Sequence, residues 1–202
     1  MEFMPNFQLH RPETIEEALQ ARTGNDEALY VAGGTDMLVN VRRGIEQPKN
    51  LVDLSAIHGM KSITVNSEGL HIGAGVTLKE LHDHEAVVKN YTAISHSAKA
   101  VAGATHQMYG TVGGNLCLDT RCLFYNQSEW WRQSNDYCLK ERGDTCHVAP
   151  GGKRCFAAFS GDMAPSMLVY EAEVDIAGEG GIKRLPLKNL YNNDGLDHLT
   201  LK

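Results

Sequence analysis

The chain has 202 residues, of which 42% are hydrophobic, and its formal net charge is −6. This size allows an apolar core in one domain or in two small ones. The mild acidity, with no basic stripe, argues against a nucleic-acid-binding protein. No apolar run approaches the ~18 residues of a membrane helix, and the N-terminus lacks the basic and apolar regions of a secretory signal. We therefore expect a cytoplasmic protein with reduced cysteines.

Strand-like and helix-like segments alternate along the chain, which predicts a mixed α+β fold. In chain order we expect a strand at 7–9, a helix after Thr14, a strand at 28–32, a short helix from Met37, a strand at 51–54, paired strands at 63–65 and 70–74, a helix after Thr77, helices over 91–104 and 164–169, and a hairpin of 174–177 with 182–187. A boundary near residue 57 divides the chain into subdomains 1–57 and 58–202.

Two glycine pairs stand beside strand-like segments of the sequence. Gly33 and Gly34 follow the strand at 28–32 and precede a short helix. Glycine adopts backbone angles that are closed to other residues, and free N–H groups at a helix start bind anions. Gly113 and Gly114 repeat this arrangement. Each pair alone is most simply a turn, but together they suggest a grip on a pyrophosphate from two sides. The three-glycine Rossmann pattern is absent, so a dinucleotide would be held by another fold.

Four cysteines lie in one polar stretch after the second glycine pair. They are Cys122, Cys138, Cys146 and Cys155. Thiolates are ligands of iron–sulfur clusters and of zinc. The stretch has few aliphatic residues, so a metal centre would supply order that apolar burial does not. The chain has five cysteines in all, an odd number that fits a disulfide framework poorly.

Zinc is the main alternative for these four cysteines. Structural zinc sites usually have paired ligands two to four residues apart, and no Cys-x-x-Cys occurs here. His147 stands next to Cys146 and could join a mixed site. From the residues alone, Cys117 could also replace one of the four; we otherwise expect it to be a buried, unreactive thiol. The cations of the stretch either form a solvated surface or favour the reduced state of a cluster. They are Arg121, Lys140, Arg142, Lys153 and Arg154.

Three motifs of the chain resemble the flavin subunit of the molybdenum hydroxylase family, to which xanthine dehydrogenase and carbon monoxide dehydrogenase belong. They are Ala32-Gly33-Gly34-Thr35-Asp36-Met37-Leu38, Gly110-Thr111-Val112-Gly113-Gly114-Asn115-Leu116 and Ser160-Gly161-Asp162-Met163-Ala164-Pro165. The resemblance implies the two-subdomain FAD-binding fold that the family shares with vanillyl-alcohol oxidase. It also implies that FAD is bound by Ala32, Gly33, Gly34, Thr35, Asp36, Thr111, Gly113, Gly114, Asn115 and Asp162.

The cysteine-rich insert, at about 117–159, narrows the resemblance to the β subunits of 4-hydroxybenzoyl-CoA reductases. Those subunits carry a 4Fe–4S cluster beside FAD, which implies that Cys122, Cys138, Cys146 and Cys155 ligate the cluster and that Cys117 does not. The implied partners are a molybdenum-cofactor subunit, a 2Fe–2S subunit and ferredoxin as electron donor. Family flavin subunits continue into a C-terminal domain, which we expect this chain to lack.

The implied function is electron relay rather than substrate chemistry. Electrons would pass from ferredoxin through the 4Fe–4S cluster and FAD toward molybdenum, where 4-hydroxybenzoyl-CoA is reductively dehydroxylated to benzoyl-CoA. No catalytic residue is expected in this chain. Two alternatives stay open: the flavin subunit of another molybdenum hydroxylase, and a zinc-stabilised module for subunit assembly.

Overall fold

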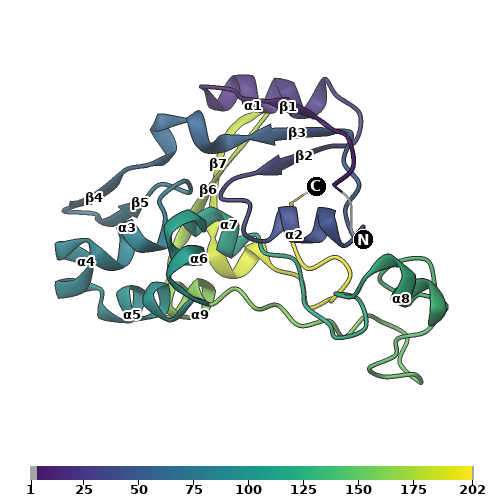
Figure 1. Cartoon of the computed structure of the whole chain (residues 1–202). Coiled ribbons are helices and arrows are strands. Elements are labelled where there is room, and N and C mark those ends of the chain that lie inside the picture. The colour runs from purple at the N-terminus through teal and green to yellow at the C-terminus, as the bar shows by residue number, and fades with distance from the viewer. Residues whose placement is uncertain (1–3, 202) are drawn as a thin grey trace.

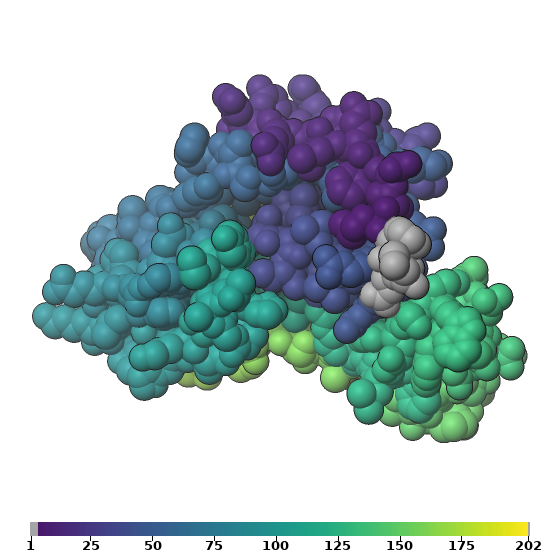
Figure 2. All heavy atoms as spheres, viewed as in Figure 1, coloured from purple at the N-terminus to yellow at the C-terminus, as the bar shows by residue number. Residues whose placement is uncertain are grey.

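A computed structural model describes residues 4–201 of the chain. It has three regions: a small N-terminal α/β unit, a larger unit rich in helices, and the cysteine insert, which extends to one side (Figure 1). The space-filling view shows the insert as a separate lobe below the N-terminal unit and opposite the helices (Figure 2). Among residues 4–201, every helix is too short or too polar to span a bilayer.

The N-terminal unit is a three-stranded parallel sheet with a helix on either side (Figure 1). Its elements are β1 (Gln8–His10), α1 (Ile15–Thr23), β2 (Ala28–Val31), α2 (Met37–Arg42) and β3 (Asn50–Asp53). The strand order is β1-β3-β2. Helix α1 begins after Thr14, whose hydroxyl accepts the Glu17 N–H at 3.1 Å. Its Ala18 packs with Val52 and Ile57 in a small apolar cluster of this unit.

The larger unit packs helices and two hairpins around a second apolar cluster. Its elements are β4 (Ile63–Asn66), β5 (Gly69–Ile72), α3 (Leu78–Asp83), α4 (Glu85–Asn90), α5 (Thr92–Ala100), α6 (Ala104–Tyr109), α7 (Val112–Leu116), α9 (Met163–Val169), β6 (Glu173–Gly178) and β7 (Gly181–Pro186). Leu81, Val87, Met163 and Leu187 are fully buried in this cluster. The two clusters divide the chain at about residue 60, and the boundary at residue 57 stays a prediction.

The mixed α+β class and both expected hairpins are confirmed by the antiparallel pairs β4–β5 and β6–β7. The expected helix over 91–104 is too long. Helix α5 ends at Ala100, because Ala102 has a φ of +44° and turns the chain into α6. The second glycine pair was expected in a loop, but it lies inside α7.

The insert contains a helix that the sequence reading missed. Helix α8 (Glu129–Ser134) begins after Ser128, whose hydroxyl accepts the Trp131 N–H at 3.4 Å. The rest of the insert is irregular. Its ends are joined by a β-bridge between Arg121 and Ala158, with N···O distances of 2.7 and 2.9 Å.

Candidate functional site

The first glycine pair packs directly against the segment that leads into the second. A Cβ on Gly33 would stand 1.7 Å from the carbonyl oxygen of Tyr109. Only glycine allows this approach. Gly34 has a φ of +69°, a left-handed conformation that also favours glycine. Within residues 4–201, the backbone N–H groups of residues 33–36 make no hydrogen bond. They are therefore free to bind an anion.

The second glycine pair uses its N–H groups inside the protein. Gly113 donates to the Ala74 carbonyl at 2.8 Å, and Gly114 donates to the Thr111 hydroxyl at 3.1 Å. A Cβ on Gly113 would lie 2.8 Å from the Cβ of Ala74. Gly113 here permits close packing, and Gly114 donates to the Thr111 hydroxyl that caps α7. The expectation that this pair repeats the first as an N–H cradle is wrong, because its donors are already bonded.

The third motif is tied to the second by a buried amide. The Asn115 side chain accepts the Met163 N–H at 2.9 Å, and Asn115 is 9% exposed. A Cβ on Gly161 would stand 2.6 Å from the Asn115 carbonyl oxygen. Asp162 is exposed and makes no capping bond to α9. The three motifs, far apart in the sequence, therefore lie together at one junction of the two units.

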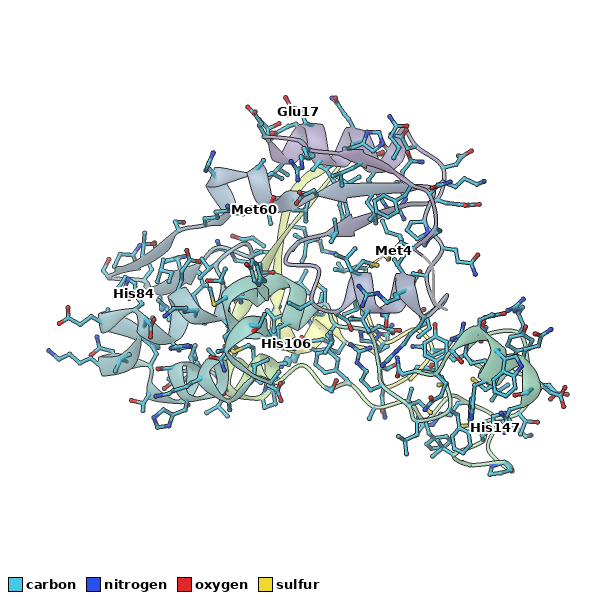
Figure 3. All side chains as sticks on the ribbon, viewed as in Figure 1. Met4, Glu17, Met60, His84, His106 and His147 are labelled. Carbon is cyan, nitrogen blue, oxygen red and sulfur yellow. The ribbon has the colours of Figure 1, made fainter. Side chains whose placement is uncertain are left out.

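The four cysteines of the insert line a single cavity. The enclosed space between them is small, about 10 Å³. The residues that line it include Cys122, Cys138, Cys146, Cys155, Phe124, Tyr125, Lys140 and His147. His147 lies among the side chains of the insert, away from the helical unit (Figure 3). Cys117 does not line this cavity and is exposed, so the expectation that it is buried is wrong.

Backbone hydrogen bonds bring the four cysteine segments to this cavity. The bridge between Arg121 and Ala158 sets Cys122 beside the segment of Cys155. The Leu139 N–H donates to the Thr145 carbonyl at 3.0 Å, which sets Cys138 beside Cys146. The cysteines that line the cavity are thus widely spaced in the sequence and form no short recognisable motif.

Backbone N–H groups surround several of the sulfur atoms. The Ala157 N–H donates to the Cys155 Sγ at 3.4 Å. Burial raises the pKa of the Cys146 thiol. Backbone N–H groups that donate to its sulfur, with that of Ala149 having the largest effect among them, outweigh burial, so the pKa of Cys146 lies below its ordinary value. Burial raises the pKa of Cys138 and of Cys155. N–H groups directed at cysteine sulfur are among the interactions that tune iron–sulfur clusters.

The positions of these side chains do not form a site for a single ion. Within residues 4–201, no three His, Cys, Asp or Glu side chains gather closely enough around one point to hold one metal ion. Four sulfurs on one zinc would stand about 3.8 Å apart, given a Zn–S bond of about 2.3 Å. Ligands of a four-iron cluster bind different iron atoms, so their sulfurs stand further apart than those around a single zinc ion.

A buried lysine lines the cavity, and Gly195 packs against the backbone of the Cys155 segment. The Lys140 side chain is 5% exposed, and its ammonium donates to Asp119 at 2.7 Å, to Thr120 at 2.6 Å and to the Gly195 carbonyl at 2.8 Å. A Cβ on Gly195 would lie 2.9 Å from the carbonyl oxygen of Cys155. Lys140 is therefore not part of a solvated surface, and nothing in the sequence marks Gly195 as a neighbour of the insert.

The family model described as "FAD binding domain in molybdopterin dehydrogenase" matches residues 5–201, and the chain belongs to this family. The chain is 29% identical over 204 residues to the aldehyde oxidoreductase FAD-binding subunit PaoB of Escherichia coli (strain K12), covering 95% of this chain and 62% of that protein. It is 22% identical to the xanthine dehydrogenase FAD-binding subunit of Escherichia coli O157:H7, covering 92% of this chain and 51% of that one. The chain thus spans between half and two thirds of the length of these relatives.

Solved structures show the same fold. Carbon monoxide dehydrogenase from Hydrogenophaga pseudoflava superposes with a TM-score of 0.74 at 18% identity, over 99% of this chain and 56% of that chain. Quinoline 2-oxidoreductase from Pseudomonas putida 86 gives a TM-score of 0.72 at 20% identity, over 99% and 56%. The expected fold, that of the flavin subunit of molybdenum hydroxylases, is confirmed by these matches.

Proposed function

We propose that this chain is the flavin and iron–sulfur subunit of a molybdenum hydroxylase of the 4-hydroxybenzoyl-CoA reductase type. The observation that carries the proposal is the cavity lined by Cys122, Cys138, Cys146 and Cys155. The insert that forms this cavity contacts residues 33–36, called here the first flavin loop, through the ion pair of Arg121 with Asp36. Membership of the FAD-binding family supports the flavin half of the proposal. The sulfur-directed N–H groups support the cluster half.

In this proposal the FAD pyrophosphate binds the first loop, where residues 33–36 have free N–H groups. Ala32, Gly33, Gly34, Thr35 and Asp36 form this part of the site. Thr111, Gly113, Gly114 and Asn115 would form its second wall by close packing, and exposed Asp162 would meet the ribityl or ribose end. FAD exchanges electrons one or two at a time and a 4Fe–4S cluster one at a time, so the pair can connect one-electron and two-electron chemistry.

The chain's own residues hold these groups rather than transform a substrate. The cysteines would bind iron, and the N–H groups would stabilise negative charge on sulfur. Lys140 would favour the reduced state, in which the cluster is more negative. Ferredoxin would supply electrons, and partner subunits with 2Fe–2S clusters and molybdenum would carry them to 4-hydroxybenzoyl-CoA in the cytoplasm.

The test is an anaerobic preparation of the chain, assayed together for iron, acid-labile sulfide, zinc and flavin. We expect iron and sulfide in equal amounts, four of each per chain, with FAD bound. Zinc without iron would contradict the proposal and favour an assembly module. The substrate is tested separately, by turnover of 4-hydroxybenzoyl-CoA with the partner subunits and reduced ferredoxin; oxidation of another aromatic or a purine instead would reassign the substrate.

A further inference from the structure

The short helix α2 follows the first flavin loop directly and depends on partners at both of its ends. It spans Met37–Arg42, and Asp36 at its start makes no capping bond with its own side chain. A helix of this length is not stable by itself in water, because nucleation costs more than so few hydrogen bonds return. Its last carbonyls, those of residues 39–41, accept N–H groups of residues 43–46. What α2 needs from elsewhere is therefore contacts that hold this turn and the preceding loop in place.

Arg132 of the insert binds the C-terminal end of α2. Its guanidinium donates to the carbonyls of Arg43 at 3.2 Å and of Gly44 at 3.0 Å. Its side chain is 1% exposed, and carboxylates of Glu129 and Glu141 pair with it at 2.6 and 2.8 Å. A cation at these carbonyls also complements the negative end of the helix dipole. Arg132 therefore holds the turn that follows α2 from a distant segment of the chain.

Arg121 of the insert binds the N-terminal end of α2. It forms an ion pair with Asp36, and its Nη1 donates to the Asn40 Oδ1 at 3.5 Å. Asn40 is 2% exposed, so this contact lies against the buried face of α2. Arg121 is also the residue before Cys122, and its backbone pairs with Ala158. The same residue thus joins the first flavin loop to the wall of the cysteine cavity.

We propose that Arg121 and Arg132 are positioning residues that make the first flavin loop depend on the folded insert. FAD then binds tightly only while the insert is ordered, and loss of the metal centre weakens flavin binding. The statement about the metal centre rests on the proposed function; the statement about the two arginines rests on the contacts at α2 alone.

The test compares Arg132→Met with Arg142→Gln in the full chain. Arg142 pairs with the same Glu129 and Glu141 at 2.6 and 3.3 Å, but it is exposed and does not contact α2. We expect Arg132→Met to raise amide hydrogen exchange in residues 37–44 and to weaken FAD binding about tenfold, the usual cost of losing one buried charged hydrogen bond. We expect Arg142→Gln to leave both unchanged.

A second variant guards against loss of folding. If Arg132→Met lacks the circular dichroism of the wild type, Arg121→Gln at the half-buried end of α2 replaces it, with the same two readouts. Unchanged exchange in residues 37–44 in a folded variant would overturn the proposal.

Chelation of iron from the wild-type chain is expected to raise the same exchange and to release FAD. A wild-type chain without iron or flavin would contradict the proposed function, while exchange in the arginine variants would still decide the role of the two arginines.

Discussion

The flavin loops and the cysteine insert are ordered by different forces. At the loops, backbone packs on backbone: Gly33 meets Tyr109, and Gly113 meets Ala74, at distances that leave no room for a side chain. In the insert, buried charges take this role. Arg132 and Lys140 are both nearly inaccessible to solvent; Arg132 pairs with Glu129 and Glu141, and Lys140 pairs with Asp119.

This difference follows from how little apolar surface the insert buries. Among residues 117–159, the buried hydrophobic side chains are Tyr125, Cys138 and Cys146 alone. Buried ion pairs rarely provide net stability, because desolvation offsets their attraction, but removing one partner is costly. The insert is therefore specified by its charges and needs further binding energy to stay ordered, which a metal centre would provide.

The largest effect is expected when a ligand of the proposed cluster is removed. Cys138→Ser deletes a thiol that is 9% exposed and lines the cavity. We expect nearly complete loss of iron and sulfide, because a neutral hydroxyl does not replace a thiolate at iron. Iron and sulfide per chain are the measurement. Cys117→Ser, at an exposed thiol outside the cavity, is the matched control and should retain both. Wild-type iron in Cys138→Ser would contradict the assignment.

A large effect of another kind is expected at the first flavin loop. Gly33→Ala places a methyl group against the Tyr109 carbonyl, which must shift. We expect a loss of about 3 kcal/mol in the free energy of unfolding, at the upper end for overpacking, together with weaker FAD binding. Urea unfolding measures the first and flavin titration the second. Gly59→Ala, at a glycine with open space around it, should change neither. Equal stability of the two variants would show that the loop backbone shifts to accommodate the added methyl group.

A smaller effect is expected where the C-terminal segment meets the insert. Gly195→Ala would bring a methyl group within 2.7 Å of the Ala157 nitrogen and 2.9 Å of the Cys155 oxygen. We expect faster loss of iron to a chelator, by several fold, with a stability change of about 1–2 kcal/mol. Gly151→Ala, in an open turn of the same insert, is the control. Gly195 does not touch the glycine loops, so Gly195→Ala should affect iron retention and not FAD affinity. A changed FAD affinity in a variant that still holds its iron would contradict this expectation.

The sequence predicted the flavin region well because its signals are local. The strand at 28–32, the glycines after it and the helix from Met37 lie next to one another in the chain, so short-range patterns describe them. The expected N–H cradle at Gly113 failed for a tertiary reason: its donor is bonded to Ala74, almost forty residues earlier. A glycine needed for close packing and a glycine needed for an exposed N–H look alike in a sequence.

The structure of the insert could be predicted much less well from the sequence. The four cysteines could be picked out by residue type, but their convergence depends on backbone bridges such as that of Arg121 with Ala158. Arg132, the most buried cation within residues 4–201, was not singled out, because a single arginine on a short helix usually faces solvent. Its partners just after α2 lie almost ninety residues away. Burial of a charge is decided by such distant partners, and composition does not reveal them.

The smallest effect is a pH dependence of the insert. Burial raises the pKa of Glu129, but hydrogen bonds from Arg142 and Tyr137 and the charge of Arg132 outweigh burial, so its pKa lies below the ordinary 4.5. A carboxyl with a lowered folded-state pKa stabilises the fold above its ordinary pKa, and this contribution is lost as pH falls through the lowered value. We expect the amide protection factors of residues 128–142 to fall below pH 4.5. Glu129→Gln should already be less protected at pH 7 and respond less to acid; an equal acid response in both chains would assign the effect to other groups.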